Sequence, residues 1–232
     1  MRIRFDMRRN PQSAAYADSV NAALVAGLVA AGAKSEDLVG VGSKPWTFAC
    51  EGRSAPNGVA KIVSLTVSTP DPDLGSALQR LRAEEVRCAS SNGDRIDLNG
   101  AKMSIIDTMS ARVDQLMVSF ASPLLISLRK GAAKDYAEDL NEVDLNEALR
   151  VVLERRAGRP LDLRFHVDPL TRLTDVRKRV VPLRKSPKGP IRVPALSFPM
   201  TISGRPEDVE FAFLAGLGSK THAGFGCPIF MK

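Results

Sequence analysis

The chain has 232 residues, of which 44% are hydrophobic, 25% charged and only 5% aromatic, and its formal net charge is +7. This is an ordinary globular composition, and it excludes a core built mainly from aromatic side chains. The length allows one large domain or two small ones. The positive charge favours a polyanionic partner, either nucleic acid or an acidic membrane surface.

Three features of the sequence argue against export, membrane insertion and a disulfide or metal framework. The first residues alternate charged and apolar side chains and lack the apolar segment of a signal peptide. The longest apolar stretch, residues 20–33, is too short to span a bilayer. The cysteines Cys50, Cys88 and Cys227 are widely spaced and form no Cys-x-x-Cys pair. We therefore expect a cytoplasmic protein without a membrane segment or a bound metal.

The first half of the chain shows alternating strand and helix patterns. Residues 2–7 place apolar and charged side chains on alternate sides, as in a half-buried strand, and residues 13–33 repeat apolar side chains at helical spacing. The later elements that we predict are strands at 46–50 and 60–68, a helix that starts at 71–73, and strands at 96–98 and 101–109. This β-α-β-β-α-β order is that of a ferredoxin-like unit.

The same order recurs after a boundary near residues 111–115. The predicted elements are a strand at 116–120, a helix at 144–156, a strand at 162–167, a β-like stretch at 191–202, a helix from 205 to about 215, and a strand at 227–230. The sequence thus predicts an α+β fold of two tandem ferredoxin-like (RRM-like) βαββαβ domains, residues 1–112 and 113–232.

The positive charge is concentrated between residues 150 and 192, which hold thirteen Lys or Arg and four Asp or Glu. Proline and serine interrupt the latter part of this segment, which indicates a loop or a long hairpin. Such a segment is either a solubilising loop or a contact for phosphates, and its charge density favours nucleic acid. The RNA-binding candidates in it are Arg172, Arg177, Lys178, Arg179, Arg184, Lys185 and Lys188.

A second candidate binding segment is the glycine-rich loop, residues 216–227, with the sequence GLGSKTHAGFGC. Glycine permits positive φ and lets the backbone approach a ligand closely. The loop therefore either connects a helix to a strand or presents backbone N–H groups to a phosphate, with Lys220 adding charge. Its spacing matches neither a Walker A nor a Rossmann fingerprint. The candidate RNA contacts here are Gly216, Gly218, Lys220, Gly224 and Gly226.

This glycine-rich loop closely resembles the C-terminal motif of the CRISPR repeat-RNA endoribonucleases, the precursor-crRNA-cleaving ("Cas six") branch of the RAMP superfamily. Three further stretches are similar to that family, in the same order along the chain: KPWTF at 44–48, FASPL at 120–124 and ISGRPE at 202–207. The resemblance implies a tandem ferredoxin-like fold. It also implies that the partners are a CRISPR repeat RNA or crRNA and other subunits of an effector complex, and that no small-molecule cofactor is used.

The resemblance further implies metal-independent cleavage, in which a ribose 2′-OH attacks the adjacent phosphorus and leaves a 2′,3′-cyclic phosphate. This step needs a general base, a general acid and a cation. Many members supply a histidine before the KPFTF-like strand, a tyrosine on the first helix and a lysine that leads into the strand. Here residues 34–43 contain no histidine, and Tyr16 lies too early on the helix to match. Only Lys44 corresponds.

The chain has two histidines, and we predict different roles for them. His222 lies in the glycine-rich loop, which borders the active site in this family, so it is a candidate acid or base. Its alternatives are a phosphate or base contact, or no function. His166 alternates to the same side of a strand as Arg164 and is expected on the surface. The predicted catalytic residues are therefore Lys44 and His222.

Three functions are consistent with the sequence. The first is an endoribonuclease that cuts precursor crRNA and stays on the product in an effector complex. The second is a catalytically silent subunit that binds the repeat RNA. The third is a generic tandem RRM-like RNA-binding protein, which is disfavoured because no aromatic-rich RNA-binding strand is present.

Overall fold

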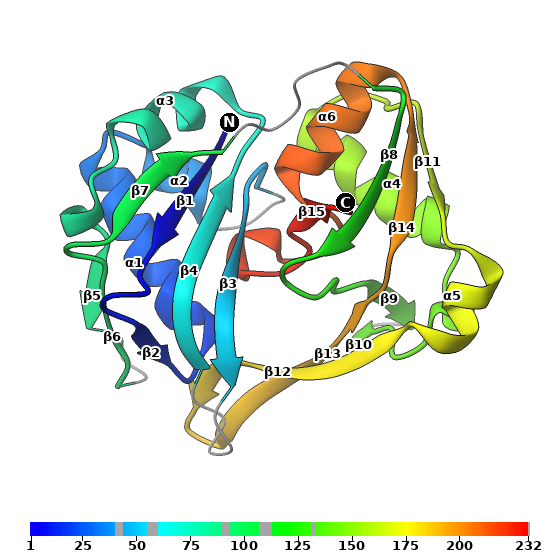
Figure 1. Cartoon of the computed structure of the whole chain (residues 1–232). Coiled ribbons are helices and arrows are strands. Elements are labelled where there is room, and N and C mark those ends of the chain that lie inside the picture. Colours follow the sequence, from blue (N-terminus) through cyan, green and yellow to red (C-terminus); the bar gives the residue numbers. More distant parts are fainter. Residues whose placement is uncertain (40–43, 55–59, 90–92, 107–112, 131–132, 232) are drawn as a thin grey trace.

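The computed structural model consists of two α+β domains that lie side by side (Figure 1). The structure describes residues 1–39, 44–54, 60–89, 93–106, 113–130 and 133–231. The predicted boundary at residues 112 and 113 borders residues 107–112, which lie outside the described residues, so its position stays a prediction.

The N-terminal domain contains a five-stranded antiparallel sheet with helices on one face. Four of its strands, β1 (Arg2–Asp6), β3 (Thr47–Ser54), β4 (Ala60–Ser68) and β7 (Lys102–Ile105), lie in the order β3-β4-β1-β7, and the short fifth strand also pairs with β4. Ile3 and Phe5 are buried against α1 (Ala17–Ala30) and α3 (Pro72–Arg80), as the sequence alternation predicts. Smaller elements are α2 (Ser35–Leu38), η1 (Ala83–Glu85), β5 (Arg87–Ala89) and β6 (Arg95–Asp97).

The first helix begins later than the predicted residue 13. Residues Gln12–Ala14 form β2, which pairs with β4. The carboxylate of Asp94 then accepts hydrogen bonds from Ala15 N, Tyr16 N and Ser19 Oγ, at 3.1, 3.2 and 2.7 Å. The helix start is therefore fixed by a distant carboxylate, which local periodicity does not reveal.

The C-terminal domain repeats the arrangement. Strands β8 (Gln115–Phe120), β11 (Leu163–His166), β14 (Met200–Gly204) and β15 (Pro228–Phe230) lie in the order β11-β14-β8-β15, all antiparallel. Helices α4 (Leu145–Ala157) and α6 (Pro206–Ala215) pack with this sheet in one hydrophobic core. In both domains the four ferredoxin-like strands lie in the order second-third-first-fourth, which confirms the predicted tandem ferredoxin-like fold.

The C-terminal domain carries insertions that the sequence patterns described only in part. β9 (Ser127–Lys130), β10 (Ala133–Tyr136) and η2 (Leu140–Glu142) precede α4, and none of them was predicted. The basic segment forms α5 (Pro169–Thr174) and a long hairpin of β12 (Arg177–Ser186) and β13 (Gly189–Ser197). The single β-like stretch predicted at 191–202 covers most of β13 and the start of a separate strand, β14. No helix within the described ranges is long and apolar enough to cross a membrane.

A buried arginine joins the two domains. Arg2 is 5% exposed, its guanidinium lies 4.7 Å from the centre of the Phe213 ring on α6, and it donates to the carbonyl of Pro228 and, at 3.1 Å, to Cys227 Sγ. Nearby, Ser68 Oγ donates to the carbonyl of Leu214 at 2.9 Å. The domains thus meet through polar side chains of the first sheet and main-chain carbonyls of the second domain.

Replacing Arg2 by Met should lower the free energy of unfolding by about 1–3 kcal/mol, because the buried carbonyl of Pro228 loses its donor. The matched control is Arg4→Met on the same strand, where the ion pair with Glu51 is solvent-exposed and its loss should cost about 1 kcal/mol or less. Urea unfolding measures both values. Equal losses in the two variants would contradict a special role for Arg2 at the interface.

Candidate functional site

The glycine-rich loop lies at the junction of the two domains and is mostly buried. Its ends are closed by hydrogen bonds from Leu217 N to the carbonyl of Gly226, at 2.8 Å, and from Gly226 N to the carbonyl of Pro123, at 2.9 Å. Ser122 Oγ accepts from Cys227 N at 3.0 Å and donates to the carbonyl of Phe48 at 3.3 Å. The loop is therefore bound to the start of the second domain and to β3 of the first.

The four predicted glycines face protein atoms at very short range. A Cβ on Gly216 would lie 2.7 Å from Thr47 Cβ, and one on Gly224 would lie 2.8 Å from the Phe48 ring. A Cβ on Gly218 would lie 2.6 Å from the Leu125 carbonyl oxygen. All four glycines, Gly226 included, also have positive φ. Packing against the other domain, at Gly216 and Gly224, and within the C-terminal domain, at Gly218 and Gly226, thus accounts for the missing side chains, and a contact of these glycines with RNA stays a prediction.

Arg156, in the last turn of α4, holds the first part of the loop. Its guanidinium donates to the carbonyl of Gly216 at 2.7 Å and to the carbonyl of Gly218. Burial lowers the pKa of Arg156 to about 9. Nothing in the sequence separates Arg156 from Arg155, so its role in the loop could not be predicted from the sequence.

Beyond these glycines the loop makes a tight turn, η3 (Thr221–Ala223), that presents His222. Lys220 before the turn has φ 54°, and Gly224 after it has φ 85°. Thr221 and Ala223 are buried, whereas His222 is partly exposed. Asn21 on α1 donates its side-chain amide to the main-chain carbonyl of His222. The turn is thus fixed on both sides while the imidazole remains accessible.

The pKa of His222 is lowered by burial and by nearby cations. Burial, followed by the charges of Lys220, Arg156 and Lys44, lowers the pKa of His222 from 6.5 to about 4. The structure therefore brings the two predicted catalytic residues, Lys44 and His222, into one electrostatic neighbourhood. Lys44 also donates to the carbonyl of Glu36. At neutral pH the imidazole is uncharged and can accept a proton.

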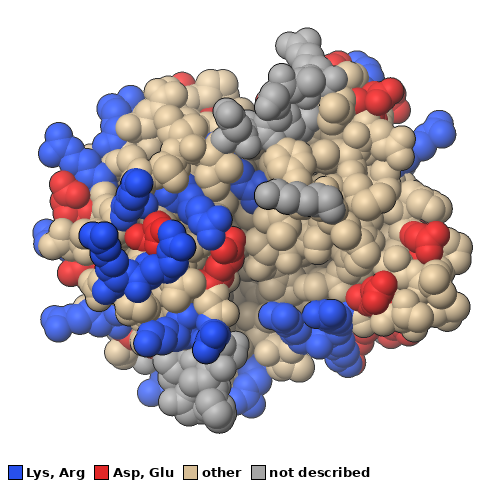
Figure 2. Space-filling view, viewed as in Figure 1, with Lys and Arg blue, Asp and Glu red and all other residues tan. Residues whose placement is uncertain are grey.

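The basic hairpin packs against the glycine-rich loop at the domain junction. Leu183 and Val193 of the hairpin share a small hydrophobic cluster with Ala223 and Phe225 of the loop, and Ala17 of α1 packs against it. The predicted RNA-binding residues of the basic segment are all exposed. Among them, Arg184 and the loop residue Lys220 both lie close enough to Asp18 on α1 to act on its charge. The hairpin, the loop and α1 thus form one surface, and Figure 2 shows basic side chains along the lower edge of the molecule, near the hairpin in Figure 1.

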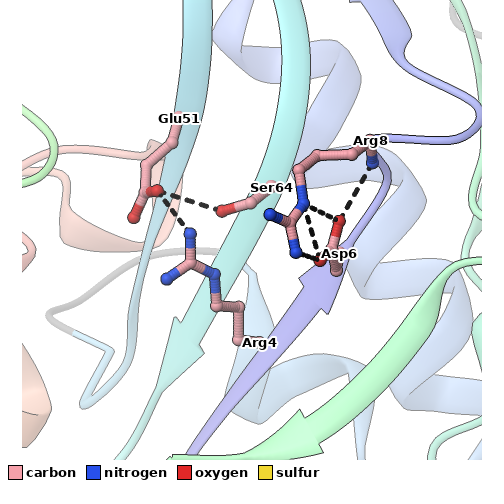
Figure 3. A network of polar contacts seen from close by, with 5 residues as sticks. All are labelled: Arg4, Asp6, Arg8, Glu51 and Ser64. Carbon is pink, nitrogen blue, oxygen red and sulfur yellow. Dashed lines mark hydrogen bonds and ion pairs between the residues drawn. The ribbon is translucent and has the colours of Figure 1, made fainter.

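A second basic area on the open face of the N-terminal sheet is balanced by carboxylates (Figure 3). Arg4 pairs with Glu51 at 2.7 Å, and Ser64 Oγ donates to the same carboxylate at 3.2 Å. Arg8 binds Asp6, and its hydrogen bonds lower the pKa of Asp6 to about 2. These arginines are therefore already occupied by carboxylates of the protein.

His166 is separate from the loop. It is exposed on β11 and lines an open cavity of about 730 Å³ with Asn146, Arg150 and Arg164. None of the lining residues belongs to the loop, α1 or the basic hairpin. Over the described ranges, no three His, Cys, Asp or Glu side chains gather in a metal-ligating cluster.

A matched pair of glycines tests how strongly packing constrains the loop. Gly226 and Gly158 have almost the same φ, 61° and 66°, but a Cβ on Gly226 would lie 1.8 Å from the Leu217 carbonyl oxygen, whereas one on Gly158 meets no atom within 4 Å. Gly158→Ala should cost about 1 kcal/mol of stability, from backbone strain alone. Gly226→Ala should cost at least about 3 kcal/mol, because overpacking adds to the strain. Thermal and urea unfolding measure the difference, and similar costs would show that the loop can relax.

Comparisons with known proteins identify the family. No curated protein matches the chain. The structure is similar to one described as a Cas6-related gene product from Pyrococcus furiosus, at a TM-score of 0.74 and 15% identity, covering 100% of this chain and 98% of the other. A RAMP protein described as binding different RNA substrates matches at a TM-score of 0.71 and 18% identity, covering all of both chains. A Cas6 product complex matches at 0.58 and 15% identity, covering 99% of each chain. These likenesses show a shared fold.

The sequence itself carries the family assignment. Residues 108–228, more than half of the chain, match the family model "CRISPR associated protein Cas6, C-terminal". This stretch contains the glycine-rich loop, the basic hairpin and the Ser-Pro motif that closes the loop. The chain therefore belongs to the Cas6 family of CRISPR associated proteins.

Proposed function

We propose that this protein is an endoribonuclease that binds CRISPR repeat RNA along the basic hairpin and cleaves it beside the glycine-rich loop. The observation that carries this proposal is the junction itself, where a half-buried, neutral His222 lies next to the hairpin and within reach of the charges of Lys220, Arg156 and Lys44. Family membership supports the same substrate, and relatives of the same fold are described as a product complex and as binding RNA. The protein stays on the crRNA in an effector complex and acts in the cytoplasm.

In the proposed reaction, His222 removes the proton from the ribose 2′-OH, which attacks the adjacent phosphorus. Lys44 compensates the charge that builds on the non-bridging oxygens and carries the proton that the leaving 5′ oxygen needs. The products are a 2′,3′-cyclic phosphate and a 5′-OH fragment, without a metal ion. RNA phosphates also relieve the repulsion among the cations, because an anion near His222 raises its pKa back toward the ordinary value.

A second candidate function is a catalytically silent subunit that holds repeat RNA. It is favoured by one observation: the free imidazole has a pKa of about 4 and is thus a weak base. Incubating the protein with a hairpin repeat RNA in EDTA separates the two functions. Cleavage supports the metal-independent enzyme, whereas stable binding without cleavage supports the silent subunit.

His222→Ala and Lys44→Ala should each lower the single-turnover cleavage rate by about 100-fold while changing RNA affinity far less. With RNA below saturation, the wild-type rate should rise as pH increases through about 4 and level off above it, because a base must lose its proton before it acts. The His222 variant should lose this rise. His166→Ala is the control and should cleave at the wild-type rate, since His166 lies in a separate cavity.

Charge at the hairpin tip should control RNA affinity. Replacing Arg184, Lys185 and Lys188 by Ala should make the plot of log affinity against log salt less steep. Each of the three lost phosphate contacts should lower the slope by up to about 0.7–0.9. The control removes the same charge from the helix-covered side of the N-terminal domain, with Arg82, Arg87 and Arg95, which are also exposed. Filter binding over a range of salt concentrations measures both. Equal slopes for the two triple variants would place the RNA elsewhere.

A further inference from the structure

The turn that presents His222 is strained and depends on contacts from outside the loop. Lys220 is the one non-glycine residue with positive φ in the described part of the chain. Such a conformation costs on the order of 1 kcal/mol and persists only when the surroundings impose it. Buried Thr221 and Ala223 impose it from the protein interior. On the side of the partly exposed imidazole, the main chain of the turn makes one more contact.

Asn21 supplies that contact. It lies on α1 of the N-terminal domain, within an otherwise apolar stretch from residue 20 to residue 33, and its amide donates to the carbonyl of His222. The hydrogen bond joins the peptide that follows the imidazole to the other domain. Asn21 also lies about one helical turn after Asp18, whose carboxylate interacts electrostatically with Arg184 and Lys220. The helix therefore contacts the turn at the residue that carries the proposed base.

We propose that Asn21 is a positioning residue, whose hydrogen bond to the main chain of His222 holds the imidazole in the cation cluster at the domain junction. This inference rests on the proposed function for its catalytic consequence, but the positioning itself is a property of the RNA-free protein. Asn21 contacts no reacting atom. It acts through the backbone of His222.

Burial is the main cause of the lowered pKa of His222, and the charges that add to it come from three elements: Lys220 in the loop, Arg156 on α4, and Lys44 before β3. Without the hydrogen bond from Asn21, the turn relaxes away from these cations and into water. Both changes favour the charged imidazole, so the pKa of His222 should rise from about 4 toward 6.5 in an Asn21→Ala variant. Alanine is the best helix former, so α1 should stay intact.

The test is a titration of the full chain without RNA, followed by NMR. The chain has only two histidines, so His166→Gln assigns both imidazole signals. In the wild type the His222 signal should stay unprotonated down to about pH 5, and in Asn21→Ala its midpoint should rise by at least about one pH unit. Asn21→Gln keeps an amide donor and should restore most of the wild-type titration.

The matched control is Asn146→Ala. Asn146 makes the same kind of contact elsewhere, donating its amide to the carbonyl of Phe165 at 3.0 Å. Its loss should lower stability but leave the His222 midpoint unchanged. In single-turnover cleavage, Asn21→Ala should be roughly tenfold slower at unchanged RNA affinity, because small misplacements of a base reduce the rate strongly.

The outcomes separate the two proposals. An unchanged His222 midpoint in Asn21→Ala, or an equal shift in Asn146→Ala, would overturn the positioning role whatever the protein does to RNA. A shifted midpoint in a protein that does not cleave RNA would support the positioning role and remove the proposed enzyme. A shifted midpoint with slower cleavage supports both.

Discussion

At the domain junction the backbone of the glycine-rich loop approaches other protein atoms so closely that no side chain fits. Gly226 faces the carbonyl oxygen of Leu217, and Gly216 faces Thr47, at distances that exclude a Cβ. Thr47 Oγ1 in turn donates to the carbonyl of Phe225 at 3.1 Å. The three sequence stretches that mark the family most clearly, 44–48, 120–124 and 216–227, meet here. These stretches therefore contact one another in the RNA-free protein.

The same packing determines the electrostatics of the site. Bringing the loop against both domains places His222 among the charges of Lys220, Arg156 and Lys44, and burial lowers the pKa values of both His222 and Arg156. Burial is the main cause of both shifts, and at His222 the charges of the neighbouring cations add to it, so an anion bound near them would favour the charged forms. On the N-terminal sheet, by contrast, Arg4 and Arg8 are neutralised by Glu51 and Asp6. The basic hairpin lies against this junction, so a phosphate backbone bound along the hairpin would also meet the cations near His222.

Periodicity predicted the tandem fold because both sheets are covered on one face, so that strands such as β1 alternate buried and exposed residues. Periodicity does not predict the parts of the structure that depend on contacts between residues far apart in the sequence. The basic segment forms a long hairpin whose Leu183 and Val193 pack on the loop, a partner that local sequence does not reveal. The glycine spacing indicated that something approaches the backbone of the loop closely. It did not indicate that the approaching atoms belong to the protein itself. Arg156 gave no local signal, whereas Asn21 did: it is a polar residue in an apolar helical stretch.

The site also belongs to neither domain alone. The imidazole and Arg156 come from the C-terminal domain, while Lys44 and Asn21 come from the N-terminal domain. The contacts that hold the two together are directional: Arg2 to the Pro228 carbonyl, Ser68 to the Leu214 carbonyl, and Ser122 to the Phe48 carbonyl. Hydrogen bonds to main-chain carbonyls specify orientation more narrowly than apolar contact does, since their energy falls steeply with angle. The geometry around His222 therefore depends on the relative orientation of the two domains. A substitution at one of these interface contacts can alter that geometry although it replaces no residue of the site.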